Sequence, residues 1–192
     1  MGYKPNPMNQ IRGMRNNAQG HIFEDVLKKA CEYYKQTGRA DIDKTPESFR
    51  VMKKHSNGTF TGRFIDLAQP DYQGTLAGGR SIIFEAKYTT TDKIERRALT
   101  DRQMETLESH YKMGASALVV FGIKDKFYTM PWEYWRDMKL HFGRQYLTQR
   151  EAEHWKVRFN GAVLFLDPVN GLYGKRAQFA VIDEYHEGVI LK

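Results

Sequence analysis

The sequence predicts an α/β fold, in which helices flank a mixed central β-sheet and a basic hairpin protrudes. Three observations predict this fold class. The 192 residues are enough for a single domain with a substantial core, but few for two. Apolar residues recur at helical spacing in some segments; in others they alternate with polar residues or form continuous strand-like runs. These two kinds of segment are interspersed along the chain, and that order favours an α/β domain with a mixed sheet.

The N-terminal segments predict an arm, a helix and a short strand. Residues 1–18 are polar, Asn-rich and basic, so we expect a flexible arm followed by a folded domain over residues 19–192. Residues 19–36 predict an amphipathic helix that ends at Thr37-Gly38, since Gly tolerates the left-handed backbone conformation. The apolar face of this helix contains Phe23, Val26, Leu27, Ala30 and Tyr34. Residues 39–48 leave room for one short strand before their proline.

Two hairpins are predicted next. Residues 49–69 alternate apolar and polar side chains around Asn57-Gly58, which is a strong hairpin signal. This segment is basic and indicates a protruding hairpin or arm, although an ordinary solvated hairpin explains the same pattern. The second hairpin joins residues 72–76 to residues 80–88 through a turn at Gly78-Gly79.

The rest of the chain predicts alternating helices and strands. Pro131 suits the first turn of a helix, and Thr148-x-x-Glu151 forms the sequence pattern of an N-terminal capping box. The expected helices are 100–113, 131–140 and 148–155, and the expected strands are 116–123, 126–130, 161–166 and 178–182.

Charge and composition limit the kind of partner and compartment. The net charge of +7 favours an anionic partner, either nucleic acid or a membrane surface, and a merely soluble basic protein is the alternative. No apolar run is long enough to cross a membrane, and the first residues lack the apolar core of a secretory signal, so we expect a cytoplasmic protein. The single cysteine, Cys31, cannot form an intrachain disulfide and is expected to be buried as a small hydrophobe.

Charged residues at the end of the apolar 81–88 run predict a metal site. Glu85 and Lys87 stand two residues apart, so their side chains lie on one face of the strand. Burying such charges costs free energy unless they are paired or hold an ion. Asp71 and Glu85 offer two carboxylates to a cation such as Mg2+, with the Ala86 carbonyl as a third ligand. Lys87 would then orient the attacking water or stabilise charge on a phosphate, whereas a simple Glu–Lys ion pair is the alternative for the short motif alone.

Pro70-Asp71 followed by Glu85-Ala86-Lys87 resembles the metal-binding signature of the PD-(D/E)xK nuclease superfamily. More closely, the chain is similar to the RecU family, the Holliday junction resolvases of Gram-positive bacteria and their phages. The similarity runs through NNAQGHIFEDVLKKACEYYKQTGRADIDKTP, DYQG, IIFEAKYT and LTDRQMETLESHYKMGASALVVF, within residues 16–123. It implies a restriction-endonuclease-like nuclease core and a homodimer that uses Mg2+ or Mn2+ to cut opposed strands of a four-way DNA junction.

The resemblance also implies roles for single residues. Glu24 matches an acid of the first helix near the metal, Asp71 and Glu85 match the metal ligands, Lys87 the catalytic lysine, and Gln103 a polar residue that faces the site. Two of these residues have an alternative role: Glu24 is favourable near the N-terminal turn of any helix, and Gln103 also completes a Thr100-x-x-Gln103 capping box.

The resemblance assigns the hairpin region a role in DNA binding. The stalk of the family, which enters the centre of the junction, corresponds to about residues 47–69 of this chain. The residues expected to contact DNA are Arg50, Lys53, Lys54, Arg63, Tyr88 and Thr89. Tyr88 and Thr89 have the alternative role of completing their strand. Gln69-Pro70 stands where the family usually has threonines, so this chain lacks those hydroxyl groups before Asp71.

These observations predict a metal-dependent, structure-specific endonuclease that resolves four-way junctions in recombination and repair. Another nuclease of the same fold, of restriction or repair type, is the first alternative. A non-catalytic DNA-binding accessory protein is the second, and loss of activity on Asp71→Asn or Lys87→Ala would distinguish an enzyme from such a binder.

Overall fold

The first helix is longer than the sequence pattern predicted. The computed structural model describes residues 7–46, 48–64 and 69–169, and α1 (Pro7–Gln36) begins at Pro7 rather than at residue 19. Residues 7–18 are therefore helical, whereas residues 1–6 of the expected arm lie outside the described residues. Gly38 has a φ of +67° and ends the helix as expected, since this left-handed conformation favours glycine.

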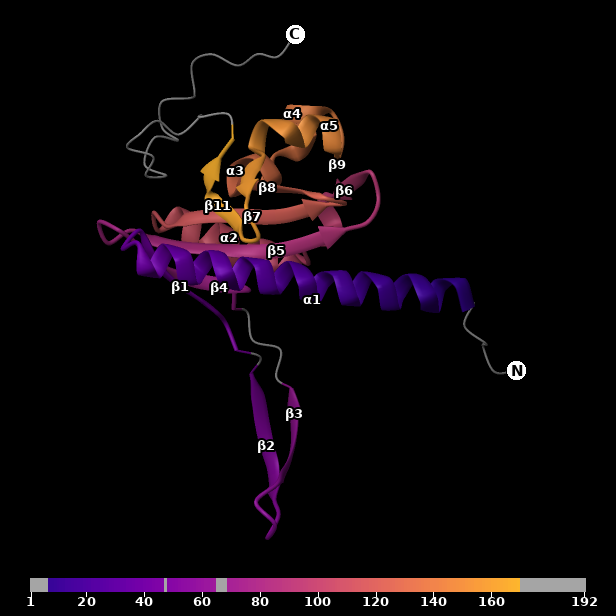
Figure 1. Cartoon of the computed structure of the whole chain (residues 1–192), viewed down its shortest axis with the longest axis vertical. Coiled ribbons are helices and arrows are strands. Elements are labelled where there is room, and N and C mark those ends of the chain that lie inside the picture. Colours follow the sequence, from indigo (N-terminus) through magenta and orange to yellow (C-terminus); the bar gives the residue numbers. More distant parts are fainter. Residues whose placement is uncertain (1–6, 47, 65–68, 170–192) are drawn as a thin grey trace.

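The centre of the molecule is a five-stranded mixed β-sheet, as predicted (Figure 1). Its order is β1 (Ala40–Lys44), β4 (Tyr72–Leu76), β5 (Ser81–Thr89), β7 (Ser116–Ile123) and β8 (Lys126–Pro131). The β5 and β7 strands are parallel and all other neighbours are antiparallel. A parallel pair needs a crossover connection, and α2 (Asp101–Lys112) lies in that connection between β5 and β7.

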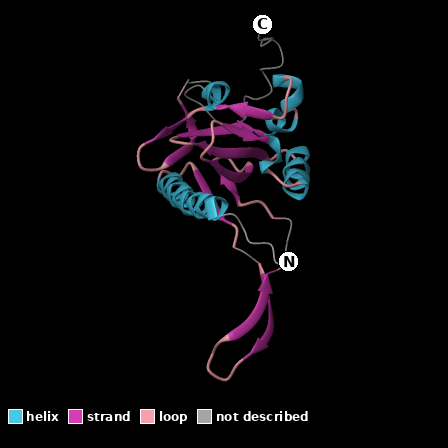
Figure 2. Ribbon diagram, turned by 90° about the vertical axis from the view of Figure 1, so that its right-hand side faces the viewer, coloured by secondary structure: helices cyan, strands magenta, loops and turns pink. Residues whose placement is uncertain are grey.

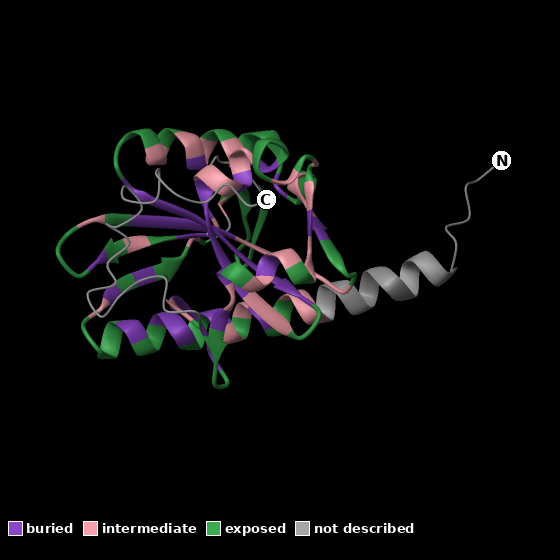
Figure 3. Cartoon of the chain, turned by 90° about the horizontal axis from the view of Figure 1, so that it is seen from above, coloured by how far each residue is buried: buried purple, intermediate pink, exposed green. Residues whose placement is uncertain are grey.

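Alternating side chains of β5 enter two cores on opposite faces of the sheet. Ile82 and Phe84 pack on one face with α1 residues such as Leu27, while Ile83 packs on the other face with Leu107 of α2. Figure 2 shows helices on both sides of the strands, and Figure 3 shows the buried strands between them. Because the side chains of a strand alternate, Glu85 lies on the face of Ile83, and Ala86 lies on the face of α1.

Close packing joins the first two strands of the sheet. A Cβ atom on Gly74 of β4 would lie 2.0 Å from the carbonyl oxygen of Asp41 in β1. The turn after β4 has φ values of +93° at Gly78 and +91° at Gly79, which confirms the predicted β4–β5 hairpin with its glycine turn. This hairpin places the start of β4 beside the middle of β5, where Tyr72 pairs with Phe84.

Several short elements complete the body, and the sequence did not predict all of them. The expected helix over residues 131–140 is wrong in detail, because two short helices meet at Asp137. The predicted capping box of Thr148 and Glu151 is present at the start of a short helix. The expected strand at 178–182 lies outside the described residues. The short elements of the body are β6 (Lys93–Glu95), η1 (Arg96–Ala98), α3 (Trp132–Arg136), α4 (Met138–Phe142), β9 (Tyr146–Thr148), α5 (Gln149–Ala152), η2 (Glu153–Trp155), β10 (Val157–Phe159) and β11 (Val163–Pro168).

A separate hairpin projects from the body, and we call residues 48–64 the stalk (Figure 1). It consists of β2 (Phe49–Lys54) and β3 (Phe60–Phe64), which pair with each other as a two-stranded antiparallel sheet. Gly58 at its tip has a φ of +82°, in agreement with the Asn57-Gly58 turn signal. In sequence the stalk lies between β1 and β4, which are hydrogen-bonded neighbours in the central sheet.

Candidate functional site

Asp71 directly precedes β4 and lies beside the middle of β5. The N–H of Thr45 donates to its carbonyl oxygen at 2.9 Å, and its Oδ2 accepts the N–H of Ala86 at 3.0 Å. The last β4–β5 pair is Tyr72 with Phe84, so the Asp71 carboxylate takes up the next N–H beyond the ladder. Its side chain is thereby directed at the segment that contains Glu85.

Glu85 is buried with one oxygen that lacks a partner. Its side chain is 0% exposed, and its Oε2 accepts a hydrogen bond from Nε2 of Gln103. Its Oε1 is buried and has no hydrogen-bond partner. A buried acceptor without a partner costs free energy, so the site favours a proton or a cation at this oxygen.

Lys87 neutralises part of the negative charge of the site. Its Nζ lies 3.6 Å from Oδ2 of Asp71 and 3.6 Å from Oε2 of Glu85. The strand alternation therefore places Glu85 and Lys87 on one face, as predicted, and the β4–β5 hairpin adds Asp71 to them. A single ammonium group faces two carboxylates, so one negative charge stays without a matching cation.

The pKa of Glu85 reflects this imbalance. Burial of the carboxyl group and, next, the neighbouring Asp71 carboxylate raise the pKa of Glu85 from 4.5 to about 8, against the opposing effect of Lys87. Two carboxylates that share a site resist ionisation together, and a divalent cation relieves that repulsion.

The donor set fits a hard divalent cation. Asp71 and Glu85 provide carboxylate oxygens, which Mg2+ and Mn2+ prefer, and Oε1 of Glu85 has no other partner. The N–H and C=O of one strand residue point to the same side of the strand, so the carbonyl of Ala86 faces the edge where its N–H meets Asp71. These three residues are the ones that would hold the ion.

Glu24 does not join the pair of carboxylates. Its Oε2 lies 2.7 Å from Nζ of Lys44, the last residue of β1. Within the described residues, no three acidic, histidine or cysteine side chains lie close enough together to hold a metal ion. The expected role of Glu24 near the metal stays a prediction.

Gln103 makes contacts of both kinds that its sequence pattern allowed. It completes the capping box of α2 with Thr100, and its amide nitrogen donates to Glu85. The residue is therefore part of a helix cap and of the surroundings of the site at the same time.

Tyr88 and Thr89 complete the strand. The Tyr88 ring lies 5.8 Å from the ring of Phe23 in α1, and its hydroxyl donates to the carbonyl of Lys124. The carbonyl of Thr89 accepts the N–H of Lys124 at 2.9 Å. Contact of either residue with DNA stays a prediction.

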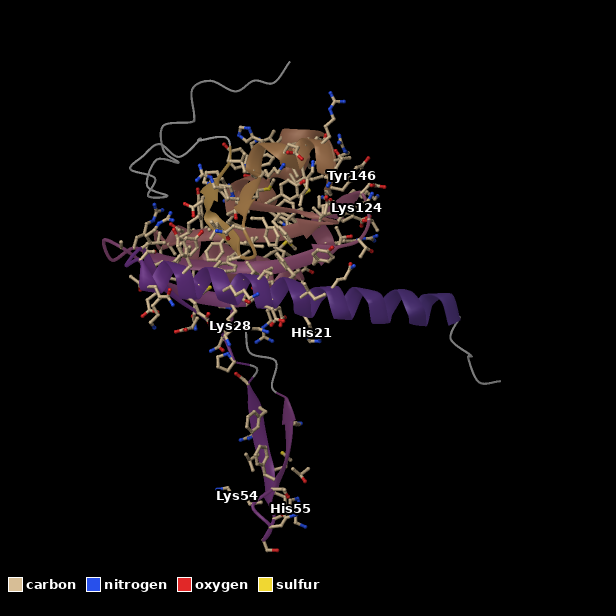
Figure 4. All side chains as sticks on the ribbon, in the orientation of Figure 1. His21, Lys28, Lys54, His55, Lys124 and Tyr146 are labelled. Carbon is tan, nitrogen blue, oxygen red and sulfur yellow. The ribbon has the colours of Figure 1, made fainter. Side chains whose placement is uncertain are left out.

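The stalk presents basic and apolar side chains to solvent. Arg50 and Arg63 are paired directly across its two strands, an arrangement of like charges that is unfavourable without an anion. Lys53 and Lys54 are exposed as well, and Figure 4 shows Lys54 and His55 near the end of the stalk farthest from the body. Its exposed apolar side chains, between 41% and 62% exposed, are Phe49, Val51, Met52 and Phe60.

Sequence reasoning missed Lys44 and Thr45. Lys44 binds Glu24, and Thr45 donates its N–H to Asp71, so the end of β1 contacts two of the acids considered for the site. The signal was faint: both residues close the short strand pattern before Pro46, but only the pairing of β1 with β4 brings them beside the site. Cys31 is buried, as predicted, and its burial raises the pKa of the thiol to about 12.

Two neighbouring carboxylates beside a lysine can hold a divalent ion and stabilise the charge that develops on a phosphate. The family model described as "RecU: Recombination protein U" matches residues 18–170. The chain therefore belongs to the RecU family, whose members are Holliday junction resolvases.

Two other comparisons add little to this assignment. Among solved structures, the chain is similar to Hjc, a Holliday junction resolvase of Archaeoglobus fulgidus, with 12% identity and a TM-score of 0.42 over 68% of this chain and 88% of that one. No curated protein matches the chain significantly.

Among the residues that the structure describes, no helix is both long and apolar enough to span a membrane, and this includes α1, the longest of them.

Proposed function

We propose that this RecU-family chain is a divalent-metal-dependent endodeoxyribonuclease that resolves four-way DNA junctions in recombination and repair. The observation that carries the proposal is the pair of neighbouring carboxylates, in which the buried Oε1 of Glu85 lacks a partner and Lys87 lies beside both acids. Mg2+ or Mn2+ is the expected cofactor, and the cytoplasm is the expected compartment.

The residues of the chain divide the chemistry among them. Asp71 and Glu85 would hold the ion with their carboxylates, and the Ala86 carbonyl would be the third protein ligand. When bound, the ion polarises the scissile phosphate and favours deprotonation of the attacking water. Lys87 donates to the phosphate oxygens and stabilises the charge that develops on them. Gln103 holds Glu85 through its amide nitrogen.

The stalk provides the selectivity for the four-way junction. Its basic side chains bind phosphates without reading base sequence, so affinity is expected to depend strongly on salt. Its exposed aromatic side chains, Phe49 and Phe60, stack on each other, and their outer faces offer surfaces on which the unpaired or strained bases at the junction centre can stack. A hairpin that projects from the body can enter the open centre while the body contacts an arm (Figure 2).

We propose that the active form is a homodimer, because the junction has approximate two-fold symmetry. An isologous dimer offers two equivalent sites to the two strands that must be cut. Mixing wild-type chains with tagged Asp71→Asn chains tests this: isolated mixed dimers should nick one strand only. Cleavage of both strands by mixed dimers, or a monomeric active form, would contradict the dimer.

The central experiment compares a four-way junction with a linear duplex of the same arm sequence. Purified protein is incubated with each labelled substrate in Mg2+, in Mn2+ and in EDTA. We expect paired cuts in opposed strands of the junction that require the metal, and Asp71→Asn should bind the junction without cutting it. Equal cleavage of the duplex would remove the resolvase assignment and leave a nuclease, whereas binding without cleavage in either metal would leave a DNA-binding protein.

A further inference from the structure

The amide group of Gln103 is held at both ends. Its Oε1 accepts the backbone N–H of Thr100 at 3.1 Å and the Thr100 hydroxyl at 3.3 Å. The same hydroxyl accepts the backbone N–H of Gln103 at 3.3 Å. The other end of the amide, Nε2, donates to Oε2 of Glu85.

These bonds decide which end of the amide faces Glu85. The oxygen and nitrogen of a glutamine side chain have nearly the same shape, and only their hydrogen bonds distinguish the two orientations. With the amide reversed, Oε1 would face the ionised, metal-binding form of the Glu85 carboxylate, where two acceptors repel each other. Thr100 provides the two donors that hold Oε1 away from Glu85, so it fixes the donor orientation.

A fixed Gln103 amide in turn fixes the oxygen that Glu85 can offer. Oε2 is occupied by Nε2 of Gln103 and lies 3.6 Å from Lys87, whereas Oε1 is buried and has no partner. We propose that Thr100 is a positioning residue of the metal site: the capping box of α2 orients Gln103 so that Glu85 directs Oε1 to the divalent ion. This inference rests on the metal site of the proposed function.

A second capping box in the chain provides the matched control. Thr148 at the start of α5 accepts the N–H of Glu151 at 3.4 Å, and its own N–H donates to Glu151 at 3.0 Å. The other carboxylate oxygen of Glu151 accepts a hydrogen bond from Arg144, and this box makes no contact with Glu85. Both boxes cap a helix with a threonine, but only the α2 box has an amide that can donate to Glu85.

The experiment measures Mn2+ binding to the full chain without DNA, from the loss of the free Mn2+ signal in electron paramagnetic resonance. Thr100→Val removes the hydroxyl and keeps the side-chain shape, Thr100→Ser keeps the hydroxyl, and Thr148→Val removes the control cap. Loss of a hydrogen-bond partner of a metal ligand typically lowers metal affinity by about 10- to 100-fold. Thr100→Val removes one hydrogen bond to Oε1 and leaves the backbone N–H of residue 100, so we expect it to weaken Mn2+ binding by about fivefold, while Thr100→Ser and Thr148→Val stay within about twofold of wild type.

A double-mutant cycle tests whether Thr100 acts through Gln103. In a Gln103→Met background there is no amide to orient, so adding Thr100→Val should change Mn2+ affinity by less than about twofold. The Mn2+ concentration for half-maximal junction cleavage should rise in Thr100→Val while the rate at saturating Mn2+ changes less. An undiminished Thr100 effect in the Gln103→Met background, an equal loss in Thr148→Val, or unchanged binding in Thr100→Val would each overturn the inference.

Failure of this inference is distinguishable from failure of the proposed function. Wild-type protein that binds Mn2+ through the Thr100-dependent site but does not cut junctions would retain the inference and remove the resolvase activity. Junction cleavage with normal metal dependence in Thr100→Val would retain the resolvase activity and remove the inference. Wild-type protein that binds no Mn2+ would overturn the inference.

Discussion

The ammonium group of Lys44 lies 2.7 Å from the carboxylate of Glu24, so the acid of the first helix is bound to the first strand of the sheet. The two side chains are 48% and 43% exposed. An ion pair with this exposure contributes on the order of 0–1 kcal/mol to stability. Such a weak pair can open, so Glu24 can be released at low cost, whereas Asp71 and Glu85 already face the same space.

The three acids are therefore expected to differ in their importance for metal binding. Asp71→Asn and Glu85→Gln should weaken Mn2+ binding by more than the roughly 10- to 100-fold that lost outer contacts cost, and Glu24→Gln by less than about fivefold, because only the first two remove a carboxylate that faces the site. Mn2+ titration of the free protein measures this, with Glu32→Gln, an exposed acid of the same helix, as control. Equal losses for Glu24 and Asp71 would place Glu24 among the ligands.

The stability of the metal-free protein is expected to fall as the pH rises from 4.5 to about 8. Folding raises the pKa of Glu85, so the protonated side chain favours the folded state. This contribution is complete below the unfolded pKa of 4.5 and is lost as the pH passes the folded value of about 8. Melting temperatures in EDTA at constant ionic strength measure the effect.

Glu85→Gln is the control for this pH dependence, because its amide does not titrate. Its melting profile should be flatter than that of wild type over the same range. Mg2+ should restore stability to wild type more strongly at pH 8 than at pH 4.5, since the ion replaces a proton that is already lost at the higher pH. Parallel profiles for wild type and Glu85→Gln would show that Glu85 does not titrate as described.

The four basic residues of the stalk are expected to determine the salt dependence of junction binding. Replacing Arg50, Lys53, Lys54 and Arg63 by Gln should lower the log–log salt slope by about 0.9 for each phosphate contact that is lost. The melting temperature should stay unchanged, because all four side chains are exposed. Replacement of Lys139 and Arg158, exposed basic residues of the body, serves as control. An unchanged slope in the stalk variant would exclude phosphate contacts there.

Tyr88 is expected to matter for stability more than for DNA affinity. Tyr88→Ala removes the ring that packs on Phe23 and the hydrogen bond to Lys124, and should cost about 1–3 kcal/mol in the free energy of unfolding. Thr89→Ala should have a smaller effect. Denaturant unfolding measures the stability of the Tyr88→Ala protein. Junction binding is measured in the Asp71→Asn background, with and without Tyr88→Ala, so that the DNA is not cut. Weaker binding at unchanged stability would give Tyr88 a direct contact with DNA.

Strands and hairpins were predicted more accurately than helix boundaries. The β7 strand and both glycine turns lie where the sequence predicted them, because continuous apolar runs and Asn-Gly or Gly-Gly pairs are local signals. The start of α1 was missed although Met8, Ile11 and Met14 recur at three-residue spacing, since an Asn-rich composition disfavours helices. The three-residue strands β6 and β9 exist only through their pairing with each other, which no local pattern reveals.

The candidate site was predictable only in part. Strand alternation is a local rule, so the shared face of Glu85 and Lys87 followed from the sequence. The contact of Asp71 with Ala86 depends on the β4–β5 hairpin, which the glycine turn made predictable. The ion pair of Lys44 and Glu24 depends on the packing of α1 against β1, and residues 20 apart in sequence carry no local sign of it.

The chain leaves the sheet after Lys44 of β1, before the stalk, and returns to it at Tyr72 of β4, and these two residues are paired partners. The length and sequence of the stalk can therefore vary without a shift in strand register. In the function proposed here, an ancestor could acquire a new substrate by exchange of this one excursion while its hydrolytic chemistry was inherited intact.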